Sequence, residues 1–137
     1  MMRSVAGFGT AVVLAHLVVT ILHGIAHADL QIGLSGAQKA FVLLVINVCP
    51  LTAMALLWTR YQRAGLMLLG SSMFASLLFG LWNHFVVSGP DHVAHVASGP
   101  SGLLFQITAV LLAFIEAAGA WWAATRLHSK AGKQTLS

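Results

Sequence analysis

The chain contains four long apolar stretches, and this feature limits what it can fold into. Each stretch has about 20 residues or more, the length an α-helix needs to cross a hydrocarbon core of about 30 Å. Of the 137 residues, 58% are hydrophobic and only 7% are charged, which argues against a soluble domain. The stretches lack the alternation of β-barrel strands and are longer than such strands. We expect transmembrane helices over Val5–His27, Lys39–Thr59, Ala64–Val87 and Gly102–Thr125.

These spans predict an all-α, polytopic integral membrane protein, a four-helix transmembrane bundle with short loops. A helix in lipid satisfies its own backbone polar groups, which an open sheet does not. The connections are too short to hold a separate soluble domain, so residues 1–137 should form a single transmembrane domain. Small residues at four-residue spacing should bring the later helices together. These residues are Ser72, Ser76 and Gly80 on the third span and Ala109, Ala113 and Ala117 on the fourth.

The basic residues predict the orientation. Four spans put both termini and the second loop on one side, and that side carries six of the seven Lys and Arg residues. The positive-inside rule makes this side cytoplasmic, including the tail at residues 126–137. The expected location is a plasma membrane, most simply a bacterial inner membrane. The basic residues flank helix ends as membrane anchors, which argues against nucleic acid as a partner.

The first span has a competing interpretation. Arg3, the apolar run and Ala26-His27-Ala28 before Asp29 resemble a secretory signal peptide with its cleavage site. Histidines within the segment are unusual for a signal peptide and favour a retained helix. The sequence leaves cleavage open, and a cleaved chain would keep three spans.

Histidines are concentrated near one membrane face. Six of the seven lie in or beside the first and third spans, and five of these gather toward the outer side. Ionisable groups in a membrane region usually mark a functional site. Neutral imidazole is a common ligand for zinc, copper and iron, and pairs three or four residues apart on a helix can serve one ion. The predicted metal ligands are His23, His27, His84, His92 and His95, with Asp91 as the favoured carboxylate.

The loop before the fourth span should position part of this cluster. Ser-Gly-Pro occurs at residues 88–90 and again at 98–100. Proline after Ser or Gly is typical of a helix start. We expect the first triplet to begin a short helical turn that carries Asp91, His92 and His95. The second triplet should begin the fourth span.

The leading hypothesis is therefore a small membrane protein that binds a transition metal at its outer face, for metal handling or transport. One alternative is an accessory or structural subunit of a larger membrane complex, or a homo-oligomer, without its own metal. Another is a metal- or haem-dependent membrane enzyme. A haem would use His23 or His27 with His84, but no second histidine pair exists near the inner side to relay electrons. The sequence does not determine the metal or whether the chain is an enzyme.

A second polar group lies deeper in the predicted bundle. His16 and Glu116 should fall within one helical turn of the same depth, and a facing pair would relieve the cost of burying each alone. The pair could relay protons or ions, or it could only fix the register of the helices. Few polar residues follow on the inner half, which favours the second role. Pro50 should kink the second span.

Overall fold

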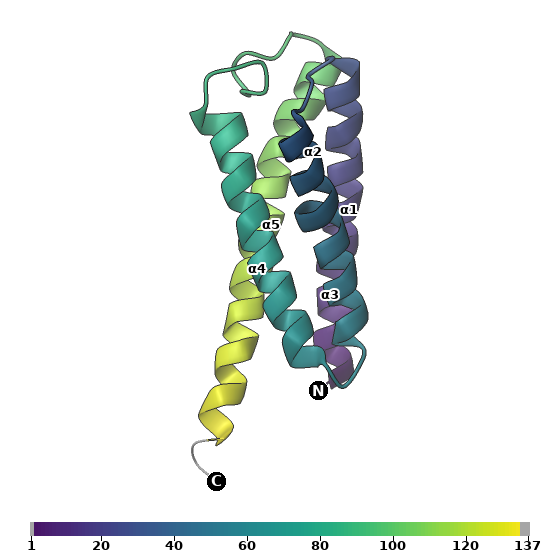
Figure 1. Cartoon of the computed structure of the whole chain (residues 1–137), viewed down its shortest axis with the longest axis vertical. Coiled ribbons are helices and arrows are strands. Elements are labelled where there is room, and N and C mark those ends of the chain that lie inside the picture. The colour runs from purple at the N-terminus through teal and green to yellow at the C-terminus, as the bar shows by residue number, and fades with distance from the viewer. Residues whose placement is uncertain (1, 135–137) are drawn as a thin grey trace.

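The computed structural model describes residues 2–134, and its regular secondary structure in that range is all helical, without strands. It forms a bundle of four long rods (Figure 1). Within the described range, four helices are long and apolar enough to cross a membrane. They cover Arg3–Asp29, Gly36–Leu57, Gln62–Val86 and Pro100–Ser129. The predicted all-α bundle is therefore confirmed, with boundaries that differ from the expected ones by a few residues.

The first rod is α1 (Met2–Asp29) and the last is α5 (Pro100–Gln134). The second rod has three segments: α2 (Gly36–Phe41), the π-helical η1 (Val42–Val48) and α3 (Cys49–Leu57). The third consists of α4 (Gln62–Leu81) and the π-helical η2 (Trp82–Val86).

The chain termini and the connections between helices are divided between the two ends of the bundle. The start of α1, the α3–α4 turn and the end of α5 lie together at one end, here called the terminal end (Figure 1). The α1–α2 and η2–α5 loops lie at the opposite end, here called the loop end (Figure 1). This is the threading expected from four consecutive spans. α5 continues through most of the residues expected to form a tail, because Ala, Lys, Arg and Gln there are good helix formers.

Pro50 changes the hydrogen-bond register of the second rod. Proline has no N–H, so the carbonyl of Ile46 loses its usual helical donor. The preceding segment widens into the π-helix η1, and the N–H of Cys49 donates to the carbonyl of Leu44, five residues back. The disturbance expected at Pro50 is thus a widened turn. π-Helical turns are frequent at functional sites, and η1 borders the cavity described below.

Apolar side chains fill the half of the bundle near the terminal end. α5 packs along both α1 and α4, and α3 packs on α4. Gly65 lets α4 approach the backbone of α3 closely, because a Cβ there would lie 3.0 Å from the carbonyl oxygen of Ala53. The cluster of buried apolar residues is Val5, Ala6, Val13, Ala53, Leu57, Leu66, Leu69, Met73 and Ala123.

The small residues that were expected to form the helix contacts are correctly predicted for α4 and only partly so for α5. Ser72 and Ser76 are buried, as predicted. On α5, Ala109 is buried but Ala117 is exposed. The close approach beyond Ala109 uses Gly119, where a Cβ would lie 3.2 Å from Val12 and 3.3 Å from Met73. α5 must face α1 and α4 together, so its buried face is set by two neighbours.

Candidate metal centre

Three of the predicted ligands meet inside the loop-end half of the bundle. His23 and His27 come from α1, and their spacing of four residues places both imidazoles on one face. His84 comes from η2 and is buried, as is His23. One ligand atom from each of the three side chains lies within 4.8 Å of the others. The convergence predicted for these three histidines is confirmed.

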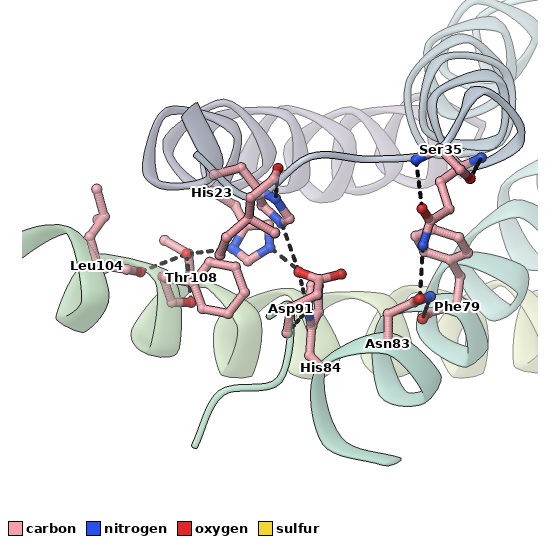
Figure 2. A network of polar contacts seen from close by, with 12 residues as sticks. His23, Ser35, Phe79, Asn83, His84, Asp91, Leu104 and Thr108 are labelled. Atoms are coloured by element: carbon pink, nitrogen blue, oxygen red, sulfur yellow. Dashed lines mark hydrogen bonds and ion pairs between the residues drawn. The ribbon is translucent and has the colours of Figure 1, made fainter. Parts of the chain in front are cut away.

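Thr108 on α5 fixes the tautomer of His23. The Oγ1 atom of Thr108 lies 2.8 Å from Nδ1 of His23 and 2.6 Å from the carbonyl oxygen of Leu104 (Figure 2). A hydroxyl has one proton, and the short contact to the Leu104 carbonyl is where it donates. Its oxygen therefore accepts from Nδ1–H of His23. In the neutral imidazole, Nε2 of His23 is then without a proton.

Asp91 fixes the tautomer of His84 in the same way. Nδ1 of His84 lies 3.0 Å from the backbone carbonyl of Asp91 and 3.2 Å from its carboxylate Oδ1 (Figure 2). A backbone carbonyl can only accept a hydrogen bond, so Nδ1 of His84 carries the proton. The neutral ring then has an unprotonated Nε2. Metal-binding histidines usually bind the ion with one ring nitrogen and donate the N–H of the other to a carboxylate or carbonyl.

The two unprotonated nitrogens face each other. Nε2 of His23 lies 3.2 Å from Nε2 of His84. Two lone pairs at this distance repel unless a proton or a cation lies between them. Two ligands of a tetrahedral ion with bonds of 2.0–2.1 Å are about 3.3 Å apart. The observed separation therefore suits a shared metal ion.

His27 and the Asp91 carboxylate complete the group. Nε2 of His27 lies 3.2 Å from Oδ1 of Asp91, and Nδ1 of His27 lies 3.4 Å from the carbonyl of Ile32. Oδ1 of Asp91 is buried and makes no hydrogen bond of good geometry, although two imidazole nitrogens lie within 3.2 Å of it. A negatively charged oxygen in this position is stabilised by a nearby cation. Asp91 therefore lies beside two of the three imidazoles, and its role as a metal ligand stays a prediction.

An aromatic ring closes one side of the centre. Phe105 is fully buried, and its ring centroid lies 4.7, 5.1 and 5.3 Å from those of His23, His27 and His84. The ring removes water from this side, which strengthens the electrostatic interactions of the group.

A neighbouring set of hydrogen bonds holds η2 in place. Ser35 and Gln38 form a capping box at the start of α2. Nε2 of Gln38 donates to Oδ1 of Asn83 at 3.1 Å, and Nδ2 of Asn83 donates to the carbonyl of Phe79 (Figure 2). Asn83 directly precedes His84, so these bonds tie α2 to the backbone that carries the third imidazole.

The other two predicted ligands lie elsewhere. His92 and His95 form a separate pair with ring centroids 4.7 Å apart, and the 4.8 Å group does not include them. Nε2 of His92 is directed at the carbonyl of Phe85, and Nδ1 of His95 at that of Gly89.

The expected helical turn at residues 90–95 is wrong, because the segment forms consecutive turns. The N–H of Val93 donates to the carbonyl of His84 at 3.0 Å, which draws the loop back onto η2. This bond competes with helical pairing. Pro100 does begin α5, as expected.

The deeper polar pair is present. Nε2 of His16 lies 3.1 Å from Oε1 of Glu116, and both side chains are buried. A cavity of about 480 Å³ connects this level with the three histidines. Lys39 and residues 31–34 line its outer end, η1 lines one wall, and Glu116 and Ser76 line its deep end.

Sequence reasoning missed two residues of the centre, Thr108 and Phe105. Thr108 looks like one more small residue in an apolar helix, and Phe105 like a lipid-facing or core side chain. Only their positions eight and eleven residues before Glu116 indicate that they share its face of α5. No family model, curated protein or solved structure matches this chain. The functional argument therefore rests on the chemistry of the site.

Proposed function

We propose that this protein binds a transition metal ion through His23, His27 and His84 at the loop end of its bundle, and that it handles or transports that ion. The observation that carries the proposal is the pair of unprotonated Nε2 atoms, 3.2 Å apart, on His23 and His84. Each imidazole is held at Nδ1 by an acceptor from a different part of the chain. The lone pairs are thereby preorganised toward one point.

The donor set indicates which ions fit. Three imidazoles and one carboxylate oxygen favour zinc, copper(II) or iron over calcium or magnesium, which prefer oxygen ligands. A haem is less suitable, because two axial imidazole nitrogens on opposite sides of an iron are about 4 Å apart with a flat macrocycle between them. His23 and His84 are 3.2 Å apart at Nε2. A bare ion therefore fits better than haem, and the proposed cofactor is the ion itself.

The charge pattern supports an orientation for this site. Six of the seven Lys and Arg residues belong to the termini or the α3–α4 turn, which we propose face the cytoplasm. The centre then faces the opposite side of a plasma membrane. An ion that enters the cavity from the loop end would reach the imidazoles before Glu116.

Elemental mass spectrometry of the detergent-purified protein, prepared without chelator, tests the proposal. We expect close to one first-row transition metal ion per chain, retained on gel filtration. His84→Ala should lose it, because this change removes one Nε2 and leaves Asp91 without its imidazole partner. The matched control is the double variant His92→Ala/His95→Ala, which removes two imidazoles of the loop pair and should keep the ion.

Two results would contradict the proposal. One is wild-type protein that holds no metal, even after reconstitution at neutral pH. The other is equal metal loss from the His84→Ala protein and the loop double variant. The first result would favour an accessory subunit whose buried histidines only bond to one another.

A further inference from the structure

A second set of polar atoms faces the deep end of the cavity, in the middle of the bundle. Glu116 uses Oε1 for His16, and its Oε2 would lie 4.0 Å from a Cβ placed on Gly80, on the wall of the cavity. Glu116 is 3% exposed and His16 is 1% exposed. A carboxylate buried this deeply in an apolar bundle needs a cation or several donors around it. His16 supplies one contact only.

Two buried hydroxyls on the wall of this cavity have no hydrogen-bond partner. They are Oγ of Ser76 on α4 and Oγ1 of Thr20 on α1, and both residues line the same cavity. Ser76 is 1% exposed. A buried hydroxyl in a helix usually bonds a carbonyl of the preceding turn, as Ser72 does with Leu69. The hydroxyl oxygens of Ser76 and Thr20 can therefore bind a ligand inside the cavity.

The spacing between the two levels is similar along three of the four rods. His16 precedes His23 by seven residues on α1, Ser76 on α4 precedes His84 on η2 by eight, and Glu116 follows Thr108 by eight on α5. These spacings are close to two helical turns, or about 10–12 Å. Each of these three rods therefore contributes one polar residue to the outer level and one to the deep level. A path along which an ion binds first at the outer level and then at the deep level would have this arrangement.

Beyond the deep level the bundle is closed. Val13 follows His16 toward the terminal end, and Met73 follows Ser76, and both belong to the buried apolar cluster. The cavity thus leads from the loop end to Glu116 and continues no further. His23, His27 and His84 line the part of the same cavity nearer the loop end.

We propose that Glu116, His16, Ser76 and Thr20 form a second and weaker site for the divalent metal ion, one step deeper than the three-histidine centre. One carboxylate, one imidazole and two hydroxyls are donors for a divalent ion of borderline character. This site rests on the proposed function in one respect, since it receives the ion that the outer centre captures. Thr20 lies between the two levels on α1, four residues after His16 and three before His23, and Ser76 lies at the deep end. A pair that only fixed helix register would not need these two oxygens left unbonded along the same cavity.

Equilibrium dialysis against Zn²⁺ alone tests the second site. All proteins carry His92→Ala/His95→Ala, so that the loop pair does not contribute. The parent should bind one tight ion and a second ion at higher Zn²⁺. Glu116→Gln, which keeps a hydrogen bond to His16, should bind only the tight ion. Ser76→Ala should weaken the second ion by about tenfold, whereas the control Ser72→Ala should not change it.

Each outcome separates this proposal from the previous one. A parent that binds only one Zn²⁺, lost in His84→Ala and kept in Glu116→Gln, would overturn the second site and leave the outer centre intact. A parent that binds no Zn²⁺ would overturn both proposals. A second ion that persists in Glu116→Gln, in a protein that still folds by circular dichroism, would also refute the deep site.

Discussion

Asp91→Asn gives the sharpest test of how the metal centre is built. The change keeps the size of the side chain and removes its charge. Oδ1 of Asp91 lies 3.2 Å from Nε2 of His27 and 3.2 Å from Nδ1 of His84, so one substitution affects two imidazoles. The backbone carbonyl of Asp91, 3.0 Å from Nδ1 of His84, stays in place and preserves the tautomer of that ring. We expect metal affinity to fall and the site to survive.

The expected magnitude follows from the position of Asp91 beside the ligands. Loss of such a supporting partner typically weakens metal binding by about 10- to 100-fold, or about 1.4–2.7 kcal/mol. Metal at about 100 times the wild-type dissociation constant stabilises the folded wild type by about 2.7 kcal/mol. The same metal concentration would stabilise a variant with 100-fold weaker binding by about 0.4 kcal/mol. A variant with 10-fold weaker binding would keep about 1.4 kcal/mol. Between about half and most of the metal-induced rise in melting temperature should therefore disappear.

The assay is thermal unfolding in detergent with and without Zn²⁺. Asp29→Asn is the matched control, because Asp29 accepts a hydrogen bond from Ser101 and belongs to no histidine contact. Asp29→Asn should keep the full metal-induced shift. If the two asparagine variants respond to Zn²⁺ alike, Asp91 does not support the centre and the reasoning from its position fails.

Three further predictions concern the tautomer, the pH and the packing. Thr108→Val should lower metal affinity by about tenfold, because Nδ1 of His23 loses its hydrogen-bond acceptor. Thr108→Ser keeps the hydroxyl and should keep the affinity, and titration calorimetry measures both variants. Metal binding should weaken when the pH is lowered from about 7.5 to about 5.5, because protonated imidazole cannot ligate; dialysis at the two values measures this. Gly65→Leu should destabilise the bundle by about 1–3 kcal/mol through contact with the α3 backbone. Gly7→Leu should leave the stability unchanged, because nothing lies within 4 Å of a Cβ there. Unfolding in detergent compares the two variants, and equal stability would contradict the packing argument.

Much of the fold could be predicted because it follows from length and polarity. A run such as Ala64–Val87 admits few structures in lipid other than a helix, and the structure has a helical rod over Gln62–Val86. The π-helical form of Val42–Val48 could not be predicted in the same way. The sequence shows that Pro50 disturbs a helix, but which neighbouring turn widens depends on what packs beside it.

The candidate site could also be predicted only in part, namely where helix geometry fixes the direction of a side chain. Helix geometry places His16, His23 and His27 on one face of α1, because their spacings are seven and four residues. His16 and His23 are buried and His27 is partly buried. His92 and His95 were grouped with them because they lie near the same membrane face and were expected in a short helical turn. A loop has no fixed period, so its histidines are oriented by hydrogen bonds such as that from Val93 to the carbonyl of His84. The structure keeps this pair together and apart from the centre.

What no sequence pattern indicates is which nitrogen of each ring is available. A histidine supplies a lone pair at Nδ1 or at Nε2, and the choice depends on what the other nitrogen contacts. For His23 that contact is Thr108, 85 positions away on α5, and the orientation of the hydroxyl is set in turn by Leu104. For His84 it is Asp91, held by a loop that returns onto η2. Three histidines at suitable spacings therefore suggest a metal site, but only their acceptors aim the two lone pairs at one point.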